Sequence, residues 1–228
     1  MERPVARSRS LARPVPAAAN DAAVGKRPRG RPRKTALDRD DGNRRQELLR
    51  SAARLFRRKG FHASSTRDIA AAAGMQSGSP FYHFKSKGAL LYAVMEEGMR
   101  LARARQADAL LPASDPATML RRLIRSHFDT LFAPGHDFIA VMLYEWRSLN
   151  ARQRLGVAQL QRDYEATWMP LLRALAADGR LRADPRLARL LIFGALNWSV
   201  QWFDKNKRAS LDELTDAAMA LFIHGGSA

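Results

Sequence analysis

The sequence contains no cysteine. This absence excludes disulfide bonds, thiolate metal sites and cysteine nucleophiles. No apolar run approaches the ~18 residues that a membrane-spanning helix needs. The first residues also lack the continuous apolar core of a secretory signal, because Arg7, Arg9, Arg13 and two prolines interrupt it. We therefore expect a cytoplasmic protein without a membrane partner.

Motifs of catalysis are absent as well. The five histidines show no metal-binding spacing. The sequence has no Gly-x-Ser-x-Gly elbow, no phosphate-binding loop and no dinucleotide fingerprint. We therefore expect no enzyme activity, no metal site and no cofactor.

Positive charge is abundant and unevenly placed. The formal net charge of the chain is +17. Most of the excess of Lys and Arg over Asp and Glu lies in the first 96 residues. A charge gradient of this kind is typical of a protein whose N-terminal part binds a polyanion such as double-stranded DNA.

Residues 1–43 are rich in Arg, Pro, Ala and Asp and have almost no large apolar side chains, so we expect a disordered basic arm. Within the arm, the Arg-Gly-Arg-Pro run at residues 29–32 resembles an AT-hook. Arg29 and Arg31 would suit the narrow minor groove of A·T tracts. A solvated tail that adds only salt-dependent affinity remains the alternative.

A helical pattern begins at Arg44 and ends at Gly60. Ser65 and Asp68 have the spacing of a capping box at the start of a second helix. Residues 66–87 then read as a short helix ended by Gly74, a tight turn and another short helix. This order predicts a helix-turn-helix, and we place the DNA-binding domain at residues 44–90.

The rest of the chain reads as helices, and no alternating strand pattern occurs. Aspartate caps before prolines are expected at Asp115 and Asp184. The predicted fold is all-α: a three-helix helix-turn-helix domain, then a helical domain at residues 91–228 for effector binding and dimerisation. Expected helices after the one that starts near Lys87 span 116–132, 137–149, 151–177 with a kink at Pro170, 185–204 and 211–224.

A capped helix, a glycine, a short recognition helix, an aromatic pair and Lys-Ser-Lys before a long helix resemble the TetR family of bacterial repressors. The resemblance covers residues 44–95. It implies that Thr66 and Arg67 open the bracing helix toward DNA, and that the second helix reads bases with its first residues. It places these further residues on DNA: Ser77, Gly78 and Ser79 at base edges, and Phe81, Tyr82, His83, Lys85 and Lys87 along the backbone. Phe84 is expected in the core instead.

The resemblance also implies a homodimer formed by the last two helices, and a small apolar effector bound among the middle helices. A dimer requires a roughly palindromic operator. Both final helices could instead lie within one subunit's own core. At the level of function, the alternative is an architectural DNA-binding protein without an effector, and activation in place of repression stays open.

The four tryptophans lie between residues 146 and 202 and predict an aromatic-walled cavity, with ordinary core packing as the alternative. Local patterns in this part are similar to family members that govern fatty-acid and sterol breakdown and respond to acyl-coenzyme A thioesters. The candidate effector contacts are Tyr144, Arg147, Trp168, Trp198 and Trp202, with Glu145, Trp146 and Tyr164 beside them.

Overall fold

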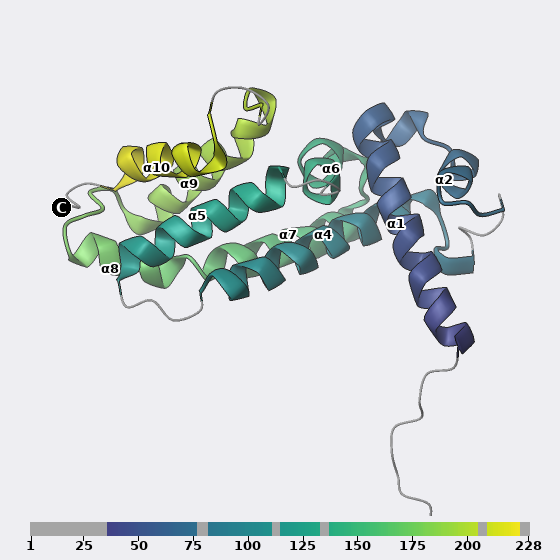
Figure 1. Cartoon of the computed structure of the whole chain (residues 1–228), viewed down its shortest axis with the longest axis horizontal. Coiled ribbons are helices and arrows are strands. Elements are labelled where there is room, and N and C mark those ends of the chain that lie inside the picture. The colour runs from purple at the N-terminus through teal and green to yellow at the C-terminus, as the bar shows by residue number, and fades with distance from the viewer. Residues whose placement is uncertain (1–35, 77–81, 111–114, 133–136, 205–208, 224–228) are drawn as a thin grey trace, which may run out of the picture. The chain divides into compact units, whose positions relative to one another are not determined.

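The computed structural model describes residues 36–76, 82–110, 115–132, 137–204 and 209–223, with side chains from residue 42 onward. All the regular structure in these segments is helical, which confirms the all-α prediction (Figure 1). None of their helices is long and apolar enough to cross a membrane. Arg29 and Arg31 of the predicted arm lie outside the described residues.

Helix α1 spans Ala36–Ala63 and so begins before Arg44, where the sequence analysis places the end of the arm. The prediction of disorder is therefore wrong for residues 36–43. Helix propagation adds one backbone hydrogen bond per residue, and this stretch contains no proline to stop it. Near its other end, Gly60 has φ +80° and interrupts the helix as predicted.

Helix α2 spans Thr66–Ala72. The Ser65 hydroxyl accepts from the Asp68 amide, and the Asp68 carboxylate accepts from the Ser65 amide. This is the capping box that the sequence predicts. Gly74, with φ +66°, ends the turn after the helix.

Three elements form the middle of the described unit. Helix α4 spans Lys87–Ala109 with Ser86 as its N-cap, and helix α5 spans Pro116–Phe132 as predicted. Helix α6 spans Asp137–Glu145 and tightens into the 3₁₀ turn η1 at Trp146–Ser148. The single helix predicted over 137–149 is therefore shorter, and its last turn changes type.

The predicted kink at Pro170 is a full break in the structure. Helix α7 spans Ala151–Ala166, and α8 spans Met169–Ala177. Pro170 has no amide hydrogen, and its ring would collide with the carbonyl of Ala166 in a continuous helix. The break turns the chain at Trp168, which is fully buried.

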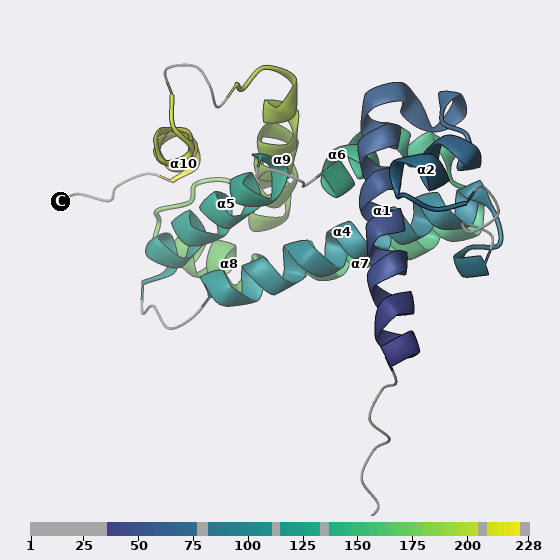
Figure 2. The same ribbon diagram turned by 45° about the vertical axis from the view of Figure 1, so that its right-hand side comes forward.

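Helix α9 spans Pro185–Trp198 and continues as the 3₁₀ turn η2 at Ser199–Gln201, and α10 spans Leu211–Phe222. Within residues 36–228, α1 and α2 lie at one end and α8 and α10 at the other, with α4 and α7 running between them (Figures 1 and 2). One continuous apolar core joins these helices.

Candidate DNA-binding and effector-binding sites

The described part of the helix-turn-helix exposes several of the residues expected to bind DNA. Arg67, Tyr82 and Lys85 are exposed, while Thr66 and His83 are half-buried. Ser77, Gly78, Ser79 and Phe81 lie outside the described residues. The described residues thus lie on either side of the expected base-contacting positions. The contacts of Ser77, Gly78 and Ser79 with bases stay predictions.

Phe84 and Lys87 support this unit from within. Phe84 is buried, as expected, with the Arg45 guanidinium 5.1 Å from its ring centroid. The Lys87 ammonium donates to the carbonyls of Phe61 at 2.9 Å and Ser64 at 3.0 Å. It also lies 4.4 Å from the Phe61 ring centroid. Lys87 therefore fastens the start of α4 to the α1–α2 junction, so its predicted contact with the DNA backbone is not the role its ammonium has here.

Helix α6 holds α1 at both of its ends. The first residue of α6, Asp137, accepts from Arg57 Nη1 at 2.7 Å. The last, Glu145, accepts from the backbone amide of Phe61 at 2.9 Å and from the Ser148 hydroxyl at 2.9 Å. Because Gly60 breaks the helix just before Phe61, the Glu145 carboxylate serves as the partner of an amide at that break.

Helices α4 and α6 are in turn closely packed. A Cβ added at Gly98 of α4 would lie 2.8 Å from the Cβ of Phe138 on α6, so only glycine fits there without a shift. On the other face of α4, Glu97 accepts from Gln46 of α1 at 2.8 Å and from Arg100. The Arg100 hydrogen bonds lower the pKa of the Glu97 carboxyl. Helices α4 and α6 therefore contact each other closely, and each is hydrogen-bonded to α1.

A small cavity lies among α4, α5, α6, α7 and α9. Its open space of about 20 Å³ is close to the room that one water needs. Any larger ligand has to push its walls apart. Its lining includes apolar residues, Met99, Ala102, Ile139, Met142 and Phe193, and polar ones, His127, Thr130, Gln161, Tyr164, Glu165 and Asn197.

Three of these residues form a polar trio: His127 and Tyr164, which are buried, and Asn197, which is half-buried. His127 Nδ1 lies 3.1 Å from the Tyr164 hydroxyl, and its Nε2 lies 3.1 Å from Asn197 Oδ1. Burial lowers the pKa of His127 to about 4 and raises that of Tyr164 above its usual range, so both side chains are neutral near pH 7. Trp168 packs edge-on against the His127 ring.

Family models match both parts of this architecture. Residues 48–94 match the model of bacterial regulatory proteins of the tetR family, and residues 113–226 match that of the tetracyclin repressor-like C-terminal domain. The chain belongs to the TetR family. The helix-turn-helix and the helical domain around the cavity are thus the two standard parts of a TetR regulator.

Several known proteins are similar to this chain over most of its length. The HTH-type transcriptional repressor KstR2 of Rhodococcus jostii (strain RHA1) is 27% identical over 185 residues, which cover 80% of this chain and 90% of that protein. The crystal structure of superantigen PfiT is 38% identical, with a TM-score of 0.70 and coverage of 80% of this chain and 97% of PfiT. AibR, solved with isovaleryl coenzyme A and operator DNA, shares the fold: its TM-score is 0.73 at 23% identity, with 78% and 97% of the two chains covered.

The effector contacts expected in this TetR chain do not line the cavity. Tyr144, Trp198 and Trp202 are more than half exposed, and Arg147 is exposed in η1. Trp168 reaches the region through its contacts with His127 and Phe193, and Tyr164, which the sequence places beside the candidate contacts, lines the cavity itself. An aromatic side chain on a helix can face either way, so richness in tryptophan does not itself mark a cavity wall.

His127 and Asn197 are among the cavity residues that the sequence does not predict. A signal is present, because His127 falls at helical spacing on the apolar stripe of Leu120, Ile124 and Leu131, and Asn197 follows an apolar run. A polar side chain in such a place needs a partner.

One face of α9 is apolar and exposed. Leu187, Leu190, Leu191 and Trp198 recur at helical spacing and are each more than half exposed. Within the part of the chain that the structure describes, this face stays uncovered, which a purely intramolecular core does not predict.

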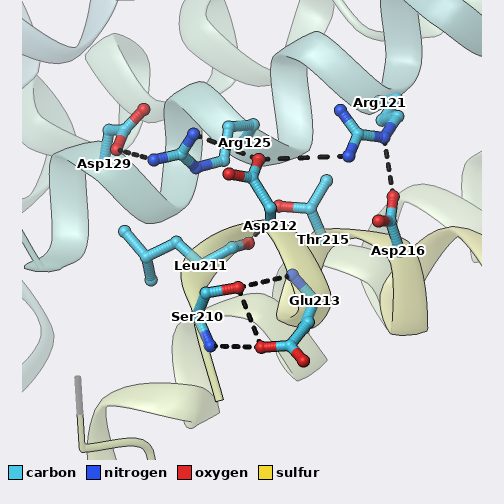
Figure 3. Close-up of polar contacts among 9 residues, drawn as sticks. All are labelled: Arg121, Arg125, Asp129, Ser210, Leu211, Asp212, Glu213, Thr215 and Asp216. Atoms are coloured by element: carbon cyan, nitrogen blue, oxygen red, sulfur yellow. Dashed lines mark hydrogen bonds and ion pairs between the residues drawn. The ribbon is translucent and has the colours of Figure 1, made fainter. Parts of the chain in front are cut away.

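Helix α10 beside this face is fastened to α5 by ion pairs (Figure 3). Arg121 Nε lies 2.7 Å from Asp216 Oδ1, and Arg125 Nη1 lies 3.3 Å from Asp212 Oδ1. The Ser210–Glu213 capping box fixes the start of α10. These contacts set the position of α10 against the rest of the subunit.

Proposed function

We propose that this chain is a ligand-responsive repressor that binds a roughly palindromic operator as a homodimer and leaves it when a small apolar effector fills the cavity. One observation carries the proposal: helices α4 and α6 both line the cavity and both hold α1. Met99 and Ala102 come from α4, and Ile139 and Met142 from α6.

The proposed coupling is mechanical. The cavity has little open space, so an effector has to displace helices that line it, and we propose that α4 and α6 are among those that move. Their ties to α1, through Lys87 and Glu145, meet at Phe61. Such a displacement would change the position of the helix-turn-helix. Release follows only if the effector binds this altered state more tightly than the DNA-binding state.

On the DNA side, the proposed contacts are Arg67 at base edges and Tyr82, His83 and Lys85 along the phosphates. Arginine pairs with guanine through two hydrogen bonds, and lysine neutralises phosphate. The +13 charge of the first 96 residues supports this assignment. Basic residues of the arm, Arg29 and Arg31 among them, would add salt-dependent affinity.

The proposed dimer uses α9 and α10. The exposed stripe of Leu187, Leu190, Leu191 and Trp198 needs a partner surface, and a two-fold copy supplies an identical one. The two helix-turn-helix units of the dimer, spaced by about one helical turn of DNA (~34 Å), then require operator half-sites with matching symmetry.

For the effector, we propose an apolar compound and include acyl-coenzyme A thioesters. The apolar wall of the cavity suits an acyl chain. AibR, which shares the fold, was solved with isovaleryl coenzyme A.

The proposal is tested by mapping the DNA bound by the full chain upstream of its own gene and then titrating the complex with acyl-coenzyme A thioesters. We expect a palindromic footprint, a preference of ~10³ or more over random DNA, and release by at least one thioester. An architectural protein would show neither the preference nor the release. Footprinting at several salt concentrations separates these outcomes.

A further inference from the structure

The polar trio of the cavity has hydrogen-bonding capacity left over. Asn197 Oδ1 accepts from His127 Nε2, so the Nδ1 atom of the ring is an acceptor and the Tyr164 hydroxyl donates to it. This arrangement leaves the Asn197 amide nitrogen without a hydrogen-bond partner among the described residues. It also leaves a lone pair on the Tyr164 oxygen. Asn197 and Tyr164 both line the cavity, so a bound molecule can be offered one donor and one acceptor there.

The charge of the cavity walls is equally specific. Among the described residues, no lysine or arginine lines this cavity. Its one carboxylate, Glu165, accepts from Arg189 Nη1 at 2.7 Å and from Gln161 at 2.9 Å. That ion pair contributes no net positive charge, and His127 is neutral near pH 7. A bound anion would lose its hydration without gaining a cation.

From this geometry we propose that the polar trio recognises one uncharged carbonyl or hydroxyl group of an otherwise apolar effector and excludes the corresponding carboxylate. The Asn197 amide donates to a carbonyl oxygen, and the Tyr164 oxygen accepts from a hydroxyl. Met99, Met142 and Phe193 contact the apolar remainder. The inference rests on the proposed role of this cavity as the effector site.

This selectivity has a chemical meaning. A thioester, ester, ketone or alcohol presents a neutral polar group, whereas the free acid is ionised near pH 7. The protein would thus respond to the activated or esterified form of an acyl compound and ignore the product of its hydrolysis.

Calorimetric titration of the full chain without DNA tests the inference at neutral pH. The probes are methyl octanoate, octanol and sodium octanoate, which share a chain length and differ in the polar group. We expect the ester and the alcohol to bind about 100-fold or more tightly than the carboxylate, because burying an unpaired charge costs several kcal/mol. Equal affinities, or no binding of ester and alcohol, would overturn it.

Variants assign the selectivity to the trio. Asn197→Leu keeps the size of the side chain and removes the donor, so it should weaken binding of methyl octanoate about 10-fold. Met142→Leu, in the apolar wall, is the matched control and should leave the ratio of ester to carboxylate affinity unchanged. Thermal unfolding shows whether each variant is folded, and Tyr164→Phe provides a second variant if Asn197→Leu is not. An unchanged affinity for methyl octanoate in folded Asn197→Leu refutes the assignment, and so does an unchanged affinity for octanol in folded Tyr164→Phe, which lacks the acceptor for the hydroxyl.

The same titrations separate this inference from the proposed function. Addition of the ester to the operator complex measures release independently of binding. Selective binding without release would overturn the proposed effector control and leave the recognition by the trio standing.

Discussion

The backbone amide of Phe61 donates to the Glu145 carboxylate at 2.9 Å, although the two residues are 84 positions apart in the chain. The end of the first helix of the DNA-binding unit is thereby completed by a side chain of the effector domain. This contact, together with the Lys87 ammonium on the Phe61 carbonyl, makes Phe61 the junction of the two parts.

Glu145→Ala should weaken the attachment of α6 to the end of α1 and so lower the stability of the protein. It leaves the Phe61 amide without its partner, and we expect a loss of about 1–3 kcal/mol in the free energy of unfolding. Chemical denaturation measures the loss. Glu145→Gln keeps an acceptor oxygen and should lose much less. If the alanine variant is as stable as the parent, the contact does not hold the junction.

Lys87 and Lys85 form a matched pair of lysines with different expected effects. Lys87→Met removes hydrogen bonds to the carbonyls of Phe61 and Ser64 and should reduce stability by about 1–3 kcal/mol. Lys85→Met should leave stability nearly unchanged and reduce the salt dependence of operator binding by about one unit of slope. Denaturation and salt-titrated binding measure both. The reverse pattern would show that Lys87 is the phosphate contact.

Arg67→Ala should reduce operator preference more than binding to random DNA. Arg67 is exposed at the start of α2, where it is expected at a base edge. Loss of a two-bond contact to guanine costs about 1–3 kcal/mol of discrimination. Arg103→Ala, at an exposed position of α4, is the control and should change neither affinity. Equal losses on operator and random DNA would contradict a base-reading role.

Leu191→Asp should convert a dimer into a monomer. The chain has a mass of 25.5 kDa, and sedimentation of the parent protein should give about twice that value. A charge in the middle of the α9 stripe would be buried unpaired in the interface. Leu155→Asp, at a leucine of α7 that is 70% exposed, should leave the dimer intact. A parent protein that sediments as a monomer refutes the interface.

His127 should make the protein acid-sensitive. Its pKa falls from 6.5 to about 4 on folding, so the unfolded chain binds its proton more tightly. Stability that is fully present above pH 6.5 should therefore decrease as the pH falls to about 4, by about 3 kcal/mol for this group.

The contribution is measured as a difference between variants. Denaturation across this pH range should show a shallower decrease for His127→Leu than for the parent chain. His62→Gln, at an exposed histidine, should follow the parent curve. Parallel curves for the parent and His127→Leu would mean that the buried ring is not responsible.

Local structure was readable from the sequence because cause and effect lie within a few residues. Ser65 finds Asp68 three positions on, Asp184 caps the amides that follow it, and Pro170 acts on the turn that contains it. The family motif, likewise, is a continuous run. These features identify the all-α fold and the starts of several helices.

The cavity was not readable in this way, because its contacts join distant segments. His127 and Asn197 are 70 positions apart, and no local sequence pattern predicts their hydrogen bond. Trp168 and Trp198 look equivalent in the sequence, yet the first is fully buried and the second is 65% exposed. Which face of a helix meets its own core depends on packing, which periodicity alone does not determine.

The small size of the proposed effector cavity also bears on the rate of effector binding. Because its open space is about 20 Å³, an effector would enter only in molecules whose walls have already moved apart. The opening step then limits the rate of binding, and adding more effector cannot raise that rate further. A brief pulse of effector would pass before most molecules open, so such a protein would answer to sustained supply.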